Sequence, residues 1–207
     1  MKAQNLIIDL DNTIYSTYSI GETLFKPIFD LIEKDKGFNS NIENIKKDIM
    51  RKPFQKVALE YNFSENLTKE GIEVLSSLDA DLKMSVFEDY KYIKNLTCKK
   101  FLVTMGFLKM QEGKIKSLGI SKDFHEIYII DPQVSQKTKK DVFLDIIEKY
   151  NLHKDDLVIV GDDPNSEIKA GIDLEIQTFL YDKLKTNSHR TDLNRIENFK
   201  QLLDYII

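Results

Sequence analysis

Short apolar runs alternate along this chain with longer segments whose apolar residues recur at helical spacing. The runs are short and mostly apolar, which is typical of parallel strands buried on both faces. The runs occupy residues 6–8, 101–104, 127–130, 157–160 and 176–180. Strands separated by helices favour right-handed βαβ connections. The pattern therefore predicts an α/β fold with a doubly wound parallel sheet.

Residues 16–83 break this alternation. No part of this stretch alternates like a strand, whereas apolar residues recur at helical spacing through it. The predicted helices cover about residues 24–36, 42–51, 54–61 and 68–78. We therefore expect a core domain built from residues 1–15 and 84–207, with residues 16–83 forming a small helical bundle that acts as a lid.

Further helices are predicted in the core, at residues 86–96, 109–118, 138–150 and 167–170. The tail from Asn194 to Ile207 is also predicted to be helical, because Ile196, Phe199 and Leu203 recur at helical spacing. We expect this tail to pack back on the core.

Polar side chains follow several of the predicted strands. The strand at 6–8 runs directly into Asp9 and Asp11. Two carboxylates at the end of a buried strand cost desolvation and mutual repulsion unless a cation lies between them, so the pair indicates a site. Other polar residues at or shortly after strand ends are Thr104, Lys137, Asp162 and Asp163. Because parallel strands deliver their carboxyl ends to one crevice, we expect these side chains to meet there.

Composition narrows the class of protein. The 207 residues are 42% hydrophobic and 31% charged, as in ordinary soluble globular proteins, and the net charge of −4 argues against binding to a nucleic acid polymer or an anionic membrane. The single Cys98 excludes an internal disulfide and a cysteine metal cluster. No apolar run approaches the ~18 residues of a membrane span, and we expect no signal peptide before the first strand. We expect a cytoplasmic protein, either a monomer or a weak dimer.

The strand-end residues resemble the motifs of the haloacid dehalogenase superfamily of phosphotransferases. Asp9-Leu10-Asp11-Asn12-Thr13 resembles the DxDxT first motif, and Thr104 is similar to the second. Lys137 matches the third motif, because apolar Phe143 follows it six positions later as in the family, although Thr138 stands where the family usually has proline.

The segment 161–167 resembles the fourth motif, GDxxxxD, with Glu167 in place of the last aspartate. The resemblance covers essentially the whole chain. It implies a Rossmann-like core with a small helical cap of the C1 type, and the activity of a phosphatase.

The resemblance and the chemistry of phosphate esters together suggest a role for each residue. Asp9 would attack phosphorus and form an aspartyl-phosphate, while Asp11 would protonate the leaving alkoxide and then take a proton from water. Thr104 would hold the phosphoryl oxygens, and Lys137 would offset their charge. Hard oxygen ligands point to Mg²⁺, bound by Asp9, Asp162 and the backbone carbonyl of Asp11. Asp163 and Glu167 would support these ligands or cap a helix.

Parts of the sequence pattern are also compatible with several other functions. A calcium loop beginning at Asp9 is close to excluded, because Ile14 and Ile20 stand where glycine and glutamate are required. A haloalkanoate dehalogenase would not need Asp11, since halide leaves without a proton. A receiver-like phospho-acceptor domain would not need the helical insertion. A phosphomutase of the β-phosphoglucomutase type and a non-catalytic binding module remain alternatives to the phosphatase.

The insertion is expected to select the substrate, which would be a small soluble phosphate monoester. A sugar phosphate or a nucleoside monophosphate is plausible, because the first motif with the following Ile14 and Tyr15 resembles the start of some pyrimidine nucleotidases. The candidates to contact the leaving group are Tyr15, Tyr18, Phe25, Arg51, Lys52 and Phe54. Arg51 is the strongest of them, as the only arginine before residue 190.

Overall fold

The computed structural model describes residues 2–38 and 40–207, and this part of the chain contains a six-stranded sheet in the order β3-β2-β1-β4-β5-β6. The strands are β1 (Asn5–Ile8), β2 (Lys99–Met105), β3 (Glu126–Ile130), β4 (Leu157–Gly161), β5 (Gln177–Tyr181) and β6 (Arg195–Ile196). Every neighbouring pair is parallel, so the doubly wound α/β fold expected from the apolar runs is confirmed.

The strand order reverses beside β1. From β1 the chain adds β2 and β3 on one side, and then crosses over to add β4, β5 and β6 on the other. The backbone register places Ile8 beside both Leu102 and Val160, which are all fully buried. A crevice opens at such a switch point, outside the carboxyl ends of the two strands that flank it. The residues that follow β1 and β4 therefore face one another across this crevice.

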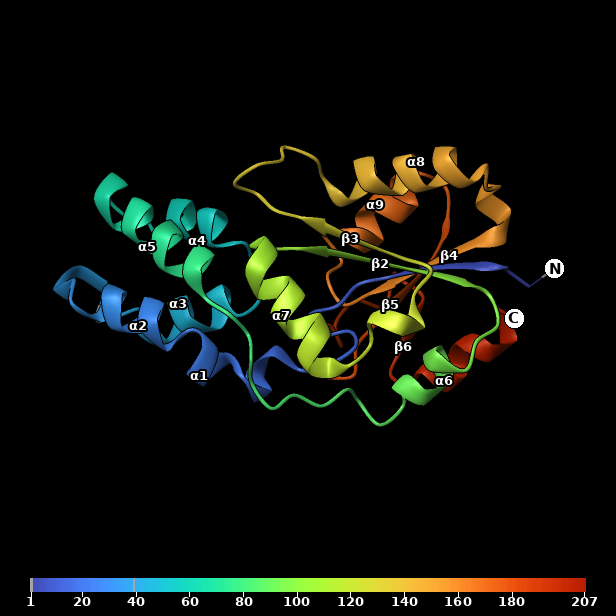
Figure 1. Cartoon of the computed structure of the whole chain (residues 1–207), viewed down its shortest axis with the longest axis horizontal. Helices are drawn as coiled ribbons and strands as arrows, with labels where there is room; N and C mark the ends of the chain where they lie inside the picture. Colours follow the sequence, from blue (N-terminus) through green and yellow to red (C-terminus); the bar gives the residue numbers. More distant parts are fainter. Residues whose placement is uncertain (1, 39) are drawn as a thin grey trace.

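Helices cover both faces of the sheet (Figure 1). On one face lie α8 (Lys139–Tyr150) and α9 (Glu167–Asp173), and on the other lie α6 (Tyr90–Lys94) and α7 (Leu108–Leu118). Successive strand side chains point to opposite faces, so Ile7 packs in the core beneath α8 whereas Leu6 and Ile8 pack in the core on the opposite side.

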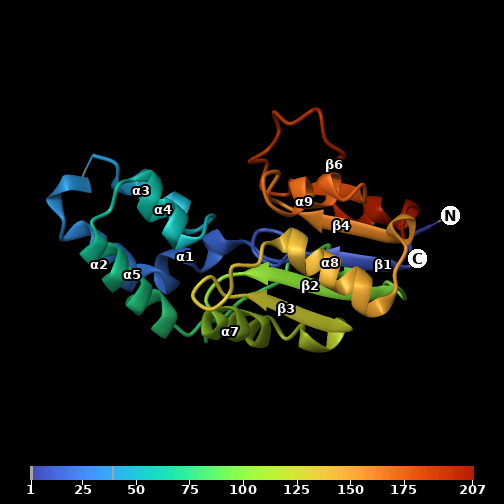
Figure 2. The ribbon, with the colours of Figure 1, turned by 90° about the horizontal axis from the view of Figure 1, so that it is seen from above.

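The first α-helices after β1 lie together beyond the carboxyl ends of the strands (Figures 1 and 2). They are α1 (Gly21–Leu24), α2 (Lys26–Glu33), α3 (Ile42–Ile49), α4 (Phe54–Glu60) and α5 (Glu65–Ser77). Helix α5 begins earlier than residue 68, because the Ser64 side chain accepts a hydrogen bond from the Leu67 amide and caps it. The division into domains at residues 16 and 83 stays a prediction.

Two predicted helices are wrong in extent or type. Only Tyr90–Lys94 is helical within residues 86–96, and the tail contains strand β6 and a 3₁₀ turn, Phe199–Asp204, instead of a regular helix. The backbone N–H groups of Leu180 and Asp182 lie along the edge of β5 and donate hydrogen bonds to carbonyl groups of the tail, at 2.9 Å and 2.8 Å. The tail therefore pairs backbone groups that an uncovered edge would leave unpaired. The apolar residues of the tail are nevertheless buried on the core as expected.

No helix within the described residues combines the length and the apolar character needed to cross a membrane.

Close packing of α5 on α4 and α2 yields the first prediction. A Cβ placed on Gly71 would lie 2.3 Å from Cζ of Phe54 and 3.0 Å from Cδ1 of Ile28, both of them buried. Gly71→Leu should therefore lower the free energy of unfolding by about 1–3 kcal/mol through overpacking, measured by chemical denaturation. Glu73→Leu, at an exposed position of the same helix, serves as the control. Equal stability of the two variants would show that this contact is not tight.

Candidate active site

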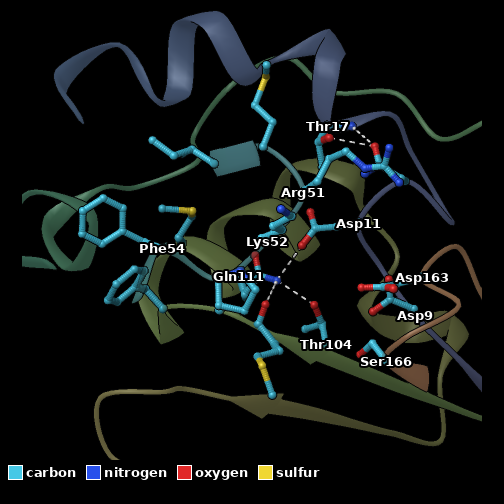
Figure 3. Close-up of a pocket in the computed structure, with 18 of the residues that line it drawn as sticks. Asp9, Asp11, Thr17, Arg51, Lys52, Phe54, Thr104, Gln111, Asp163 and Ser166 are labelled. Carbon is cyan, nitrogen blue, oxygen red and sulfur yellow. Dashed lines mark hydrogen bonds between the residues drawn. The ribbon is translucent and has the colours of Figure 1, made fainter. Parts of the chain in front are cut away.

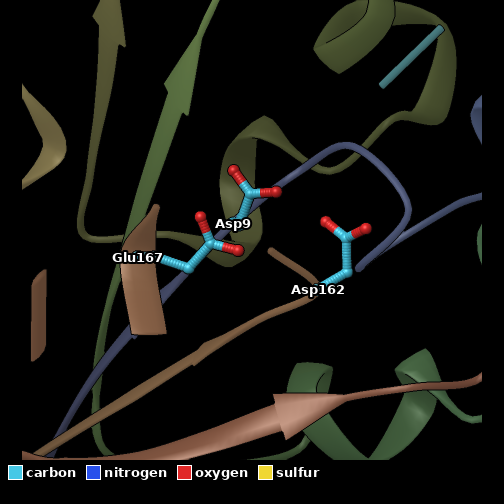
Figure 4. Close-up of side chains that lie close together, drawn as sticks. All are labelled: Asp9, Asp162 and Glu167. Atoms are coloured by element: carbon cyan, nitrogen blue, oxygen red, sulfur yellow. The ribbon is translucent and has the colours of Figure 1, made fainter. Parts of the chain in front are cut away.

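Three carboxylates converge where β1 and β4 end (Figure 4). Asp9 directly follows β1, Asp162 directly follows β4, and Glu167 is the first residue of α9. Each of them offers an oxygen within 4.8 Å of the others. Asp9 and Glu167 are only 6% and 1% exposed, so their charges are withdrawn from water and need compensation.

Lys139 supplies this compensation. Its ammonium lies 2.5 Å from Oδ1 of Asp9 and 2.7 Å from Oε2 of Glu167, and the residue is 8% exposed. The other oxygen of Glu167 accepts a hydrogen bond of 2.7 Å from the Asp163 amide. Glu167 therefore ties together the starts of α8 and α9 and the loop after β4.

Lys137, which the third motif suggested, does not reach this site. Its exposed side chain pairs with Asp145 at 2.5 Å, and the position that the sequence assigned to Lys137 is taken by Lys139. Thr138 caps α8, because its hydroxyl accepts from the Asp141 amide while the Asp141 carboxylate accepts from the Thr138 amide. Lys137 thus precedes the helix, whereas Lys139 occupies its first turn and points into the crevice. The Thr-x-x-Asp pattern was the signal that could have selected Lys139.

Asp11 has partners of its own (Figure 3). Its Oδ1 accepts hydrogen bonds from the Tyr15 hydroxyl at 2.5 Å and from Lys114 Nζ at 2.8 Å, and its Oδ2 accepts one from Gln111 Nε2 at 2.9 Å. Gln111 Nε2 also lies 2.6 Å from Oγ1 of the buried Thr104. Asp11 and Thr104, both expected at the site, are therefore brought together by a residue of α7.

Gln111 and Lys114 were missed by sequence reasoning. They lie in a predicted helix and are three residues apart, so they share one face of it. Polar residues at that spacing usually form a solvated face, and the sequence carries no signal that this face is buried.

The two aspartates of the first motif have opposite electrostatic environments. Burial raises the pKa of Asp9 to about 7; Lys139 opposes this shift, whereas Glu167 and Asp11 add to it. Burial also raises the pKa of Asp162 well above its usual range, with further contributions from Glu167 and Asp9. Burial acts in the same direction on Asp11, but the charge and hydrogen bond of Lys114, together with the hydrogen bonds from Tyr15 and Gln111, outweigh it and hold the pKa of Asp11 below its usual range.

The acidic cluster fits a hard divalent cation. Its donor atoms are all oxygens. The single positive charge of Lys139 is smaller than the combined negative charge of the three carboxylates when they are ionised, so the cluster can accept a further cation. Both oxygens of Glu167 already accept hydrogen bonds, so Asp9 and Asp162 are the carboxylates with oxygens left for a cation. Asp163 is engaged in a turn, where its Oδ1 accepts from the Asn165 amide at 2.8 Å.

The helical segment forms the opposite wall of the pocket. Its lining residues are Phe25, Ile49, Met50, Arg51, Lys52, Pro53, Phe54, Gln55 and Leu75. Arg51 reaches across to the core, where its Nη2 lies 3.5 Å from Oγ1 of Thr186. Lys52 is paired with Asp48 and Glu60 instead. Of the other expected contacts, Tyr15 binds Asp11, and Tyr18 is not among the lining residues.

The family model for haloacid dehalogenase-like hydrolases matches residues 4–174. The chain belongs to the haloacid dehalogenase-like hydrolases. The matched residues include both aspartates of the first motif, Thr104, Lys139 and the loop after β4, so the site described above lies within the part of the chain that defines this hydrolase family. No curated protein matches the chain.

Several solved structures share the fold over nearly the whole chain. A putative phosphoglycolate phosphatase from Lactobacillus plantarum is 14% identical, with 100% of both chains covered and a TM-score of 0.75. A putative phosphatase from Clostridium difficile is 17% identical, with 100% of both chains covered and a TM-score of 0.69. A putative HAD-hydrolase from Bacillus subtilis, bound to magnesium, is 17% identical, with 99% of this chain and 98% of that chain covered and a TM-score of 0.64.

The raised pKa of Asp9 makes stability depend on pH. The carboxyl of Asp9 has its ordinary pKa of 3.8 in the unfolded state and a pKa of about 7 in the folded state, so stability falls as pH rises between these values. In a chelating buffer, Asp9→Asn should stabilise the protein relative to wild type, and the gain should be larger at about pH 7.5 than at about pH 4.5, by about 1–4 kcal/mol.

Urea denaturation of both proteins at the two pH values measures this difference. An equal effect of Asp9→Asn at both pH values would mean that Asp9 ionises in the folded protein as it does in the unfolded chain.

Proposed function

We propose that this hydrolase is a Mg²⁺-dependent phosphatase that hydrolyses a small phosphate monoester through an aspartyl-phosphate on Asp9. The observation that carries the proposal is the convergence of Asp9, Asp162 and Lys139 at the switch point of the sheet, facing a wall of helices. The names of the phosphatases with the same fold, and the magnesium bound to one neighbour, support it.

Asp9 is the nucleophile in this proposal. A lone pair of one carboxylate oxygen of Asp9 attacks phosphorus, and the other oxygen would be left to help hold Mg²⁺. The new oxygen–phosphorus bond forms while the bond from phosphorus to the leaving oxygen breaks. Asp11, which takes up a proton when the phosphate anion binds beside it, gives that leaving oxygen the proton. Water then attacks the phosphorus of the aspartyl-phosphate, Asp11 takes a proton from it, and Asp9 is restored as inorganic phosphate leaves.

The remaining groups stabilise charge. Thr104 Oγ1 accepts the hydrogen bond from Gln111, which leaves its own hydroxyl proton for a phosphoryl oxygen. Lys139 offsets the charge that develops on the phosphoryl group, the role that the sequence assigned to Lys137. Asp9, Asp162 and the backbone carbonyl of Asp11 would hold Mg²⁺, which when bound neutralises the carboxylates and the phosphate so that an anion can attack an anion.

The helical segment 16–83 acts as a cap domain in the same proposal. Closing it over the crevice would exclude water and bring Arg51 to the leaving group. Arg51 can bind an oxygen-rich group with its guanidinium, as expected for a sugar phosphate or a nucleoside monophosphate. The proposal also includes a cytoplasmic location, which is expected from the cysteine content.

A nucleophilic Asp9 predicts the result of one substitution. Purified protein should hydrolyse p-nitrophenyl phosphate with added Mg²⁺, and chelation should abolish this activity. Asp9→Asn should lower kcat by at least about a thousandfold, because an amide cannot form the aspartyl-phosphate. Release of p-nitrophenolate measures the rate.

Unchanged turnover by Asp9→Asn would refute the phosphatase. Transfer of the phosphoryl group to a sugar instead of to water, detected by product analysis with hexose phosphates, would favour the phosphomutase.

The two lysines near the start of α8 give a matched pair of variants. Lys139→Met should lower kcat by about a hundredfold or more, because it removes the ammonium that faces Asp9. Lys137→Met should keep wild-type kcat, because its exposed ammonium pairs with Asp145. Both are measured with p-nitrophenyl phosphate at saturating Mg²⁺. Loss of activity in Lys137→Met alone would restore the assignment made from the motif.

A further inference from the structure

A second buried lysine, Lys114, lines the same pocket as Lys139 and comes from α7, which covers the opposite face of the sheet from α8 (Figure 1). Lys114 is 4% exposed, and its Nζ lies 2.8 Å from Oδ1 of Asp11. Among the described residues, Asp11 is the one carboxylate within 4.0 Å of this ammonium. Replacing a buried ion pair by apolar side chains is often neutral or stabilising, so stability alone is a weak reason for the pair.

Gln111 holds the other oxygen of the same carboxylate. It is 1% exposed, and its Nε2 lies 2.9 Å from Oδ2 of Asp11 and 2.6 Å from Oγ1 of Thr104. Its Oε1 is buried without a hydrogen-bond partner among the described atoms. The amide is therefore oriented by its contacts with Asp11 and Thr104, at the cost of an unsatisfied oxygen.

Helix α7, which carries both residues, is itself fixed in place. Its Ser117 hydroxyl donates to the Ala80 carbonyl at 2.9 Å, and a Cβ on Gly113 would lie 2.8 Å from the Ala80 amide nitrogen. At its start, the Leu108 amide donates to Oδ2 of Asp131 at 2.8 Å. Gln111 and Lys114 are thus presented to Asp11 from a rigid element.

We propose that Lys114 and Gln111 are positioning residues that hold the two oxygens of Asp11 in the orientation needed for proton transfer to the leaving group. This inference rests on the proposed function for the role of Asp11. Proton transfer requires hydrogen-bond geometry between Asp11 and the leaving oxygen. Loss of the hydrogen bond from Lys114 or from Gln111 lets the carboxyl group of Asp11 rotate away from this geometry, and the transfer slows. Neither residue needs to touch the reacting atoms.

Leaving groups of different basicity test this role. Phenyl phosphate and p-nitrophenyl phosphate have similar shapes, but phenolate is the more basic leaving group and depends more on a proton from Asp11. The comparison uses kcat/KM with Mg²⁺, since this constant includes the departure of the leaving group. Lys114→Met should lower kcat/KM for phenyl phosphate about tenfold more than for p-nitrophenyl phosphate. Gln111→Met should change the ratio in the same direction.

Three further variants make the result specific. Lys116→Met, at an exposed position of α7, should leave both values unchanged. Asp11→Asn alone should lower kcat/KM more for phenyl phosphate than for p-nitrophenyl phosphate. Adding Lys114→Met to Asp11→Asn should not change the ratio of the two kcat/KM values further, because Lys114 acts through Asp11. Asp9→Asn measures the background rate.

Equal losses for the two substrates in Lys114→Met and Gln111→Met, or no loss, would overturn the inference and leave Asp9 as the nucleophile untouched. If Lys114→Met fails to fold, as judged by circular dichroism, the ratio measured for Gln111→Met decides. Full activity of Asp9→Asn would instead defeat the proposed function, and with it the role of Asp11.

Discussion

Compensation of buried negative charge at the switch point is the constraint on which the site depends. Asp9 and Glu167 come from distant parts of the chain and meet because one ammonium, that of Lys139, lies between them. The backbone makes room for this contact, since a Cβ on Gly161 would lie 2.2 Å from Cγ of Glu167. The same interaction joins the first residue of α8 to the first residue of α9, so the geometry of the candidate active site and the packing of one face of the sheet are coupled.

A second cation, Lys114, separates the electrostatic environment of Asp11 from that of Asp9. The carboxyls of these two residues lie two positions apart in the chain, yet burial raises the pKa of Asp9 whereas Lys114 lowers that of Asp11. Pairs of titratable groups whose environments move their pKa values apart are suited to different steps of one reaction. The backbone after β1 contributes to this separation, because Asn12 turns the chain with a φ of 55° before Tyr15 returns to Asp11.

The helices that face the sheet complete the site from the other side. Both segments that join them to the core are anchored on it: Tyr15, just before the first of these helices, donates to the Asp11 carboxylate, and Ala80, after the last of them, packs on α7. The pocket wall that they form is mostly apolar, with Arg51 as a cation that reaches toward Thr186. In the proposed phosphatase, the charged groups of the site thus come from the strand ends and from the helices that flank the sheet, whereas the surface available to the rest of a ligand comes from the helices that follow β1.

The amino-acid sequence by itself determined the parallel α/β fold and the helical insertion, because short apolar runs identify buried strands. It also determined the strand-end positions of Asp9, Asp11, Thr104 and Asp162, because a polar residue at the end of a buried strand costs desolvation free energy and therefore indicates a site. Only the tertiary structure decided which lysine faces Asp9, that α7 buries Gln111 and Lys114 against Asp11, and that the tail pairs with β5. The physical reason is that periodicity records which positions are apolar, whereas the partner of a buried polar group depends on where distant elements bring their donors and acceptors.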